Sequence, residues 1–277
     1  MKFSIITPSF RNSNWLKLCI ASVADQGEQV EHIVQDAGSD DGTQDWLLRD
    51  KRVKAFVEKD AGMYDGVNRG LRRASGDIVA YLNCDEQYLP GALRTVEDFF
   101  ERHPEVDVVF GGGIVVRADG SFLCQRRAVV PMKAHTQVSG ALAILSCASF
   151  FRRRLLDDER LFFDPRYRIM ADAHWVLALL ESRARMGIVQ EFTSAFTSTG
   201  ENLSLKPEAQ REIRATQLGA PAWARVLRQG VLAHHRLRKL LAGHYWQKPF
   251  DYAIYTAKSP ERRVSIHVSK PTARWKW

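Results

Sequence analysis

The chain is predicted to be an α/β protein built on a mostly parallel sheet flanked by helices. In its first half, short apolar strand-like runs alternate with helical patterns of roughly ten to fifteen residues, a succession typical of parallel sheets. Polar residues follow these runs, at the positions where a parallel sheet gathers the carboxyl ends of its strands. The 277 residues, 45% of them hydrophobic and 26% charged, are ordinary for a soluble globular protein with a sizeable core.

The expected elements of the first half follow one another closely. Strands are expected at residues 2–7, 30–35, 53–58 and 77–82, helices at 13–25, 63–73 and 90–102, and a short helix after residue 43. Pro8 is expected to end the first strand, Ser13 to cap the first helix and Pro90 to lie in the first turn of its helix. Right-handed crossovers would then bring the strand ends to one edge of the sheet.

After residue 106 the expected strands become shorter and are separated by glycine turns. They are expected at residues 106–110, 114–117, 122–125 and 148–152, with a helix at 171–182 and further helices at 207–218 and 222–243. The last twenty residues are basic and show no periodic pattern.

Charge divides the chain near Gly200. Residues 1–200 carry 25 Lys and Arg against 27 Asp and Glu, whereas residues 201–277 carry 15 against 5. This asymmetry predicts an α/β domain at 1–200 and a basic, mainly helical extension at 201–277 with an anionic partner.

Cysteine usage and hydropathy indicate a cytoplasmic protein. The four cysteines show neither paired nor metal-ligand spacing, which favours reduced thiols. The first twenty residues lack the basic and apolar regions of a secretory signal, and no apolar run approaches the ~18 residues of a membrane span.

Two strand ends carry acidic residues that suit a nucleotide and its metal. Asp36 ends one expected strand, and Asn83-Cys84-Asp85 ends another ~50 residues later. An acidic group at the end of a buried strand is unfavourable unless a cation or a hydrogen-bond donor meets it. In an open α/β sheet, ligands bind at these carboxyl ends.

Four segments of the chain resemble family-2 glycosyltransferases of the GT-A fold. They lie in the family's order within residues 1–180: ITPSFRN (6–12), VQDAGSDDGT (34–43), EKDAGMYDGVNRGLRRASGDIVAYLNCDEQYLPGAL (58–93) and YRIMADAHWVLAL (167–179). Bacterial enzymes that extend lipopolysaccharide, capsule or exopolysaccharide chains are most similar. The resemblance implies a Rossmann-like GT-A sheet and transfer of a sugar from a nucleotide-diphosphate donor to an acceptor hydroxyl, the acceptor being a saccharide or a lipid-linked saccharide.

The resemblance assigns the nucleotide to the first two strand ends. Thr7, Pro8 and Ser9 would meet the base through backbone and hydroxyl groups, and Asp36 would accept a hydrogen bond from a base N–H. Ser39 would lie near the donor. The alternative for Asp36 is a turn cap, because Asp favours such turns.

Asp85 is the expected metal ligand. The diphosphate leaves with negative charge, and Mg²⁺ or Mn²⁺ held by Asp85 would stabilise it as a Lewis acid. Asn83 stands where the family usually has a first Asp; it can bind ribose or sugar hydroxyls but adds no charge, which puts metal dependence in doubt. The alternative is a polar corner between strand and loop.

Between these sites, the glycine and polar residues of 60–70 offer further donor contacts. Gly62 permits close approach of the backbone to a ligand. Asp65 and Asn68 occupy positions that resemble donor contacts in the family, but a first-turn Asp equally suits the helix dipole.

Asp172 is the expected catalytic base. An acceptor hydroxyl needs a base within hydrogen-bond reach, and one carboxylate suffices for direct displacement with inversion. Its alternative role is helix capping. His174 stands where relatives often carry another Asp; it and His135 are expected acceptor contacts, although a lone His is more often packed and hydrogen-bonded.

The basic extension allows two kinds of anionic partner. Apolar and basic residues alternate over 222–247 as in an amphipathic helix on an anionic membrane, and tryptophans follow among basic residues up to 277. A helix packed on the catalytic half is the alternative. Nucleic-acid binding by the extension lacks a recognisable motif, and a nucleotidyltransferase lacks its glycine-rich phosphate loop near the N-terminus.

Overall fold

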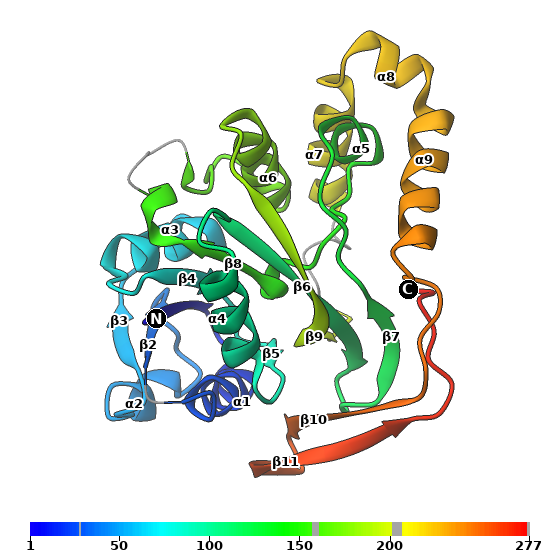
Figure 1. Ribbon diagram of the computed structural model, residues 1–277. Coiled ribbons are helices and arrows are strands. Elements are labelled where there is room, and N and C mark those ends of the chain that lie inside the picture. Colours follow the sequence, from blue (N-terminus) through cyan, green and yellow to red (C-terminus); the bar gives the residue numbers. More distant parts are fainter. Residues whose placement is uncertain (28, 157–160, 201–206, 276–277) are drawn as a thin grey trace.

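The computed structural model describes residues 1–277 except 28, 157–160, 201–206 and 276–277, and within that part the sheet has nine strands (Figure 1). The strands are β1 (Phe3–Ser9), β2 (Val30–Asp36), β3 (Lys54–Val57), β4 (Ile78–Tyr81), β5 (Gln87–Tyr88), β6 (Val108–Arg117), β7 (Phe122–Arg126), β8 (Ser149–Arg152) and β9 (Met186–Ser198). Their order is β3-β2-β1-β4-β8-β6-β9-β5, with β7 paired to β6.

Helices and a separate hairpin surround this sheet (Figure 1). The helices are α1 (Ser13–Ala24), α2 (Thr43–Leu47), α3 (Met63–Arg73), α4 (Ala92–Arg102), α5 (Lys133–Ser139), α6 (Ala171–Glu181), α7 (Pro207–Leu218), α8 (Ala222–Val226) and α9 (Arg228–Leu241). The hairpin strands are β10 (Phe250–Thr256) and β11 (Ser259–Val268).

The first half of the chain has the predicted alternating arrangement. β3, β2, β1 and β4 are parallel neighbours, and α1 and α3 pack on this part of the sheet. In the parallel pairing, Ser9 lies opposite Asp36 and Ile6 lies opposite Tyr81. The predicted α/β fold with a mostly parallel sheet is confirmed.

Three local predictions in this half were wrong by a few residues. β1 continues through Pro8 to Ser9, which is tolerated because β4 pairs only with residues 3–6 and no ladder partner is lost there. Ser13 is the first helical residue and does not cap α1; its hydroxyl accepts a hydrogen bond from Trp46. Pro90 lies in the turn before α4.

In the second half, the glycines of 111–113 form no turn. They lie inside the continuous strand β6, where Gly111 and Gly113 allow Thr193 and Leu145 to pack against the backbone; a Cβ at either glycine would clash. The sequence also failed to predict β5, α5 and the long strand β9, which pairs in parallel with β6.

The expected extension is helical only in its first part. The predicted helix at 222–243 is broken at Leu227 into α8 and α9, and the unpatterned last twenty residues contain β11. The hairpin shares a hydrophobic cluster with the sheet that includes Leu89, Ile114 and Tyr252. A domain boundary near Gly200 stays a prediction, which limited proteolysis would test.

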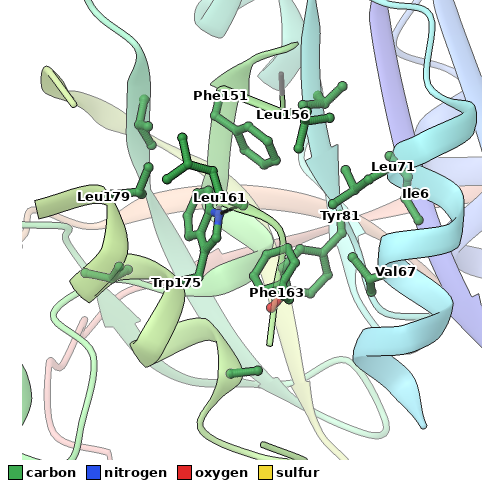
Figure 2. Close-up of a cluster of buried hydrophobic side chains, with 14 of the residues drawn as sticks. Ile6, Val67, Leu71, Tyr81, Phe151, Leu156, Leu161, Phe163, Trp175 and Leu179 are labelled. Carbon is green, nitrogen blue, oxygen red and sulfur yellow. Dashed lines mark hydrogen bonds between the residues drawn. The ribbon is translucent and has the colours of Figure 1, made fainter. Parts of the chain in front are cut away.

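The largest described hydrophobic cluster lies between α3, α6 and the sheet (Figure 2). Tyr81 at the end of β4 and Trp175 of α6 both pack against Phe163, with ring centroids 5.1 and 5.2 Å apart. The Trp175 indole N–H also donates to the Leu161 carbonyl at 2.6 Å. This packing fixes α6 against the strand end that carries the acidic residues.

Candidate active site

The carboxyl ends of β2, β1 and β4 form one edge. Ser9 lies opposite Asp36 at this edge, and the N–H of Leu82 still bonds to Ile6 at 2.9 Å, so the turn at residues 83–86 follows beside them. Parallel pairing thus brings the first two predicted acidic positions to the same edge of the sheet.

Asp36 is fully buried and organises its own turn. One carboxylate oxygen accepts the backbone N–H groups of Gly38 (3.0 Å) and Ser39 (2.7 Å), and the other accepts the Ser39 hydroxyl (2.7 Å). The Ser39 hydroxyl accepts the Arg11 N–H at 2.8 Å. Asp36 therefore has the turn-forming role considered above, while its second oxygen can accept one further donor.

The side chains of residues 7–9 differ in location: that of Thr7 lies in the core, and that of Ser9 lies at the edge of the sheet. Thr7 is buried and its hydroxyl lies 2.9 Å from His32, so this side chain is committed to the core. Pro8 offers no donor. The Ser9 hydroxyl is also buried but has no hydrogen-bond partner in the part of the chain that the structure describes. An orphan polar group at this edge suits a ligand.

Asp60, which was not among the predicted site residues, is a further carboxylate within electrostatic range of Asp36. Burial raises the pKa of Asp60, and the charges of Asp65 and Asp36 raise it further against the effect of its bond from Gly62 N–H. Gly62 has φ 133°, so the turn before α3 depends on glycine. Asp60 could have been identified from the sequence by its position two residues before Gly62.

Asp65 and Asn68 of α3 make structural contacts. Asp65 accepts the Ala61 N–H at 3.0 Å and pairs with Arg69 at 2.9 Å. Asn68 donates its amide N–H to the Phe163 carbonyl at 2.6 Å and accepts the Phe163 N–H at 3.0 Å. Both polar ends of Asn68 thus hold the segment that leads to α6.

The turn after β4 is a buried acidic corner. Asn83 Oδ1 and Glu86 Oε1 are buried without a hydrogen-bond partner among the described residues, and Glu86 Oε2 accepts the Asn83 N–H at 2.8 Å. Burial raises the pKa of Asp85, and burial together with the Asp85 charge raises that of Glu86. Glu86 is the second residue that the prediction omitted.

This corner fits a divalent cation. Two adjacent carboxylates and an orphan amide oxygen are the donor types that Mg²⁺ and Mn²⁺ prefer, and a cation would offset the burial that raises both carboxyl pKa values. Within the described ranges no three His, Cys, Asp or Glu side chains are grouped to hold a metal. The protein would therefore supply part of the coordination, leaving positions for phosphate and water oxygens.

Asp172 lies in the first turn of α6, beside two tyrosines. It keeps partial access to solvent, yet its carboxyl is enclosed closely enough that burial raises its pKa to about 7, with a small contribution from Glu212. Burial first, and then the Asp172 charge, raises the pKa of both Tyr64 and Tyr81. Tyr81 also interacts with Glu86. The hydroxyl of Tyr81 is thus within electrostatic range of both Glu86 and Asp172.

Glu212 of α7 positions Asp172 from the C-terminal side, which no sequence signal indicated. Its carboxylate accepts the backbone N–H groups of Arg168, Ile169 and Met170, each at 2.9 Å, just before α6 begins. These bonds hold the segment that leads into α6. The expected extension therefore shapes the surroundings of the expected base.

The two expected acceptor histidines are packed side chains. His174 stacks on Tyr167 at 3.7 Å, and its ring nitrogen lies 3.1 Å from the Thr216 hydroxyl. His135 is buried and stacks on His235 at 3.5 Å. Their acceptor roles stay predictions.

One cavity of the structure lies away from these acidic groups. It has a volume of about 580 Å³ and is lined by residues of β9 and β10 and by Arg127 and Gln247, not by Asp36, Asp85 or Asp172. Asp36 and the turn at 83–86 follow strands of the same edge, and Tyr81 interacts electrostatically with Glu86 and Asp172.

The fold and this edge define a class of protein: α/β enzymes that bind nucleotides at the carboxyl ends of a parallel sheet. The family model for "Glycosyl transferase family 2" matches residues 4–162, more than half of the chain. The chain belongs to glycosyl transferase family 2, as the resemblance of its motifs predicted.

Curated relatives match parts of the chain. A "GalNAc(5)-diNAcBac-PP-undecaprenol beta-1,3-glucosyltransferase" of Campylobacter jejuni is 35% identical over 102 residues, 34% of this chain and 33% of the relative. A "PGL/p-HBAD biosynthesis glycosyltransferase" of Mycobacterium bovis is 29% identical over 181 residues, 61% of this chain and 66% of the relative. The chain thus spans a third to two thirds of the length of these relatives.

Solved structures share the fold at low sequence identity. The S. aureus protein TarS, as residues 1–349 in complex with UDP, has a TM-score of 0.59 at 21% identity and covers 87% of this chain and 72% of that one. The mannosyltransferase PcManGT of Pyrobaculum calidifontis, in complex with GDP-Man and Mn²⁺, has a TM-score of 0.55 at 17% identity and covers 89% and 76%.

Proposed function

We propose that the chain is an inverting glycosyltransferase that moves a sugar from a nucleotide-diphosphate donor to an acceptor hydroxyl. The observation that carries this proposal is the carboxyl of Asp172, whose pKa burial raises to about 7, next to the strand edge that bears the acidic corner. A general base works best when its pKa lies near the working pH. Membership of glycosyl transferase family 2 supports the reaction type.

The donor nucleotide would bind at the edge formed by β1 and β2. The orphan hydroxyl of Ser9 and the second oxygen of Asp36 are a donor and an acceptor suited to a base or ribose. Structural neighbours bind UDP, UDP-GlcNAc and GDP-Man, which supports a nucleotide sugar without fixing its base.

The acidic corner would hold the metal that accompanies the diphosphate. Asp85 and Glu86 would supply carboxylate oxygens and Asn83 its amide oxygen, and the bound cation would act as a Lewis acid on the leaving diphosphate. The Mn²⁺ in the PcManGT complex supports a divalent cation for this fold.

Asp172 would take the proton from the acceptor hydroxyl as that oxygen attacks the anomeric carbon. The nucleotide diphosphate leaves from the opposite face, so a single displacement inverts the anomeric centre. Glu212 would hold the start of α6 so that the Asp172 carboxyl faces the acceptor.

A donor panel tests this function directly. Thermal shifts with nucleoside diphosphates and nucleotide sugars, with and without Mn²⁺, should identify one stabilising base, and the matching sugar donor should then support transfer to a saccharide or lipid-linked saccharide acceptor. The Campylobacter relative, whose name contains a PP-undecaprenol acceptor, makes a lipid-linked saccharide the first acceptor to assay. If no nucleotide diphosphate stabilises the protein, the proposed function is wrong.

We further propose that α8 and α9 contact an anionic membrane at its cytoplasmic face. The outer sides of these helices expose large apolar residues beside arginines: Trp223, Val226, Leu227, Leu237 and Leu241 are all more than half exposed. Apolar area together with basic charge is the requirement for binding at an anionic lipid surface. No described helix is long and apolar enough to cross a membrane.

Point substitutions test this contact better than truncation, since removing everything after residue 200 would also remove Glu212. Trp223→Ser combined with Leu241→Ser should reduce flotation with vesicles that contain anionic lipid. Leu48→Ser removes an equally exposed apolar residue from the N-terminal half and should leave flotation unchanged. Equal flotation of both variants would contradict the membrane contact.

A further inference from the structure

A group of basic side chains lies where α9 packs against α5 and the end of β7; its lysine and histidines are buried and its two arginines are half-buried. Its members, called here the basic cluster, are Arg126, His135, His235, Arg238, Lys239 and His244. Lys239 is only 8% exposed, and it acts electrostatically on His135, His235 and His244. A buried lysine is rare in proteins unless a partner compensates its charge.

The basic cluster has no counter-charge. Among the described residues no Asp or Glu forms an ion pair with Arg126, Arg238 or Lys239. Burial, reinforced by the neighbouring cations, lowers the pKa of Lys239 to about 8 and that of His235 to about 3. The described partners of the two arginines are neutral, since Arg126 lies over the Trp275 ring at 5.7 Å and Arg238 donates to a carbonyl, so a bound anion would supply the counter-charge that these cations lack.

Several hydrogen-bonding groups of the basic cluster also lack partners. Nδ1 of His135 and Nδ1 of His235 are buried and unbonded in the described part of the chain, as is one terminal nitrogen of Arg238, whose other one donates to the Val130 carbonyl at 2.8 Å. Stacking of the two histidine rings at 3.5 Å holds both Nδ1 atoms in fixed positions. Unbonded nitrogen atoms that can donate, next to cations without an ion pair among the described residues, are suited to an oxyanion.

The surroundings of the basic cluster indicate which oxyanion. Two arginines and one lysine favour a multiply charged group with several acceptor oxygens over a single carboxylate. α9 buries Lys239 and His235 while it exposes Leu237 and Leu241, so charge lies inside and apolar surface outside on one helix. α5 in turn contacts α6, which carries Asp172.

We propose that the basic cluster is a binding site for a phosphate or diphosphate group, and that the group belongs to the headgroup of a lipid-linked acceptor. Arg126, Arg238 and Lys239 supply the positive charge, and the two stacked histidines supply N–H donors. The headgroup would be held beside α5 while the lipid chain stays at the apolar side of α9. Only the source of the phosphate rests on the proposed function; the anion site itself does not.

Lys239→Met tests the site, with Arg236→Met as the matched control. Both substitutions remove one positive charge from α9, but Arg236 is exposed. The probe is inorganic pyrophosphate in the presence of EDTA, measured by thermal shift and calorimetry. Lys239→Met should weaken pyrophosphate binding about tenfold or more, because it removes a buried ionic contact, whereas Arg236→Met should leave the Kd unchanged.

The stability of the free protein supplies a second readout. Lys239→Met should raise the melting temperature without pyrophosphate, because burial, which lowers the pKa of Lys239 to about 8, disfavours its charged form, whereas a lysine with a structural partner would lower the melting temperature when replaced. Arg126→Met repeats the binding test from a different element. If pyrophosphate stabilises wild type and Lys239→Met equally, or stabilises neither, the anion site is wrong.

Two further measurements separate this proposal from the proposed function and fix the source. Nucleoside diphosphate with Mn²⁺ should stabilise Lys239→Met as much as it stabilises wild type. If it does not stabilise wild type, the donor site is contradicted and the basic cluster is not. A short-chain prenyl diphosphate should bind wild type about tenfold more tightly than pyrophosphate does. Loss of this difference in Lys239→Met would support a lipid headgroup as the source of the phosphate. Equal Kd values would overturn the lipid source.

Discussion

Replacing Asp172 with Asn should abolish transfer and stabilise the protein in the same variant. The folded pKa of about 7 lies above the ordinary value of 3.8, so the native state favours the protonated carboxyl. Ionising it inside the fold therefore reduces stability as pH rises from 3.8 through 7. The difference of 3.2 units, 7 minus 3.8, corresponds to as much as about 4 kcal/mol above pH 7.

The neutral Asn side chain avoids this loss. At pH 8 the free energy of unfolding of Asp172→Asn should exceed that of wild type by up to about 4 kcal/mol, or roughly 8 °C in melting temperature. The gain should shrink below pH 7 and vanish near pH 4. Turnover should fall by about 10²-fold or more, the usual contribution of a general base, with donor affinity unchanged.

Asp164 supplies the matched control. Its hydrogen bond from Arg166 lowers the pKa of its carboxyl, so Asp164→Asn should leave stability unchanged or slightly reduced at pH 8 and should not increase it. Thermal melts from pH 4 to 8 and initial rates at saturating donor measure both effects. Unchanged turnover in Asp172→Asn, or a lower melting temperature than wild type at pH 8, would refute the reasoning.

Four other substitutions address the metal, α3 and glycine packing. Asp85→Ala should weaken donor binding in calorimetry only when Mg²⁺ or Mn²⁺ is present, and a chelator without effect on activity would contradict the metal. Asn68→Ala leaves the buried N–H and carbonyl of Phe163 unpaired and should cost about 2–4 kcal/mol in urea unfolding, together with slower turnover; full turnover would separate Asn68 from the position of α6. Gly70→Ala introduces a Cβ that clashes with β1 and should cost about 1–3 kcal/mol, whereas Gly230→Ala on α9 meets open space and should stabilise by about 1 kcal/mol.

The sequence predicted the first half of the sheet well because each element there carries its own signal. Apolar strands and amphipathic helices alternate up to residue 102, and the bounds of α3 agree with the expectation. β9 was missed because polar residues occupy its buried positions: Ser194 donates to the Cys147 carbonyl at 2.6 Å, and Thr193 to that of Gly112 at 3.2 Å. Such partners come from distant parts of the chain and leave no local pattern.

The hairpin at the C-terminal end did carry a signal that was overlooked. Val264, Ile266 and Val268 recur at every second position, the period of a strand with one buried face. Dense basic charge obscured this alternation. The buried face of β11 is explained only by its partner strand β10 and by the sheet against which the hairpin packs.

Residue types at the candidate site were predictable, but their surroundings were not. The sequence singled out Asp36, Asp85 and Asp172. It did not indicate that Tyr81 would lie within electrostatic range of both Glu86 and Asp172, or that Glu212 from the extension would hold the segment before α6. A shifted pKa depends on what surrounds a group, and the neighbours Tyr64, Tyr81 and Glu212 of Asp172 come from three distant parts of the chain.

The double hydrogen bond between Asn68 and the Phe163 backbone limits how this enzyme can be recombined with its homologues. A chimera that exchanges only the segment around α3 would combine residue 68 of one parent with residues 161–175 of the other. The two hydrogen bonds that join these segments could then be lost. Crossovers should therefore fall outside 60–175 or carry both segments from one parent. Evolution faces the same constraint, so changes in donor preference and in acceptor geometry are expected to be inherited together.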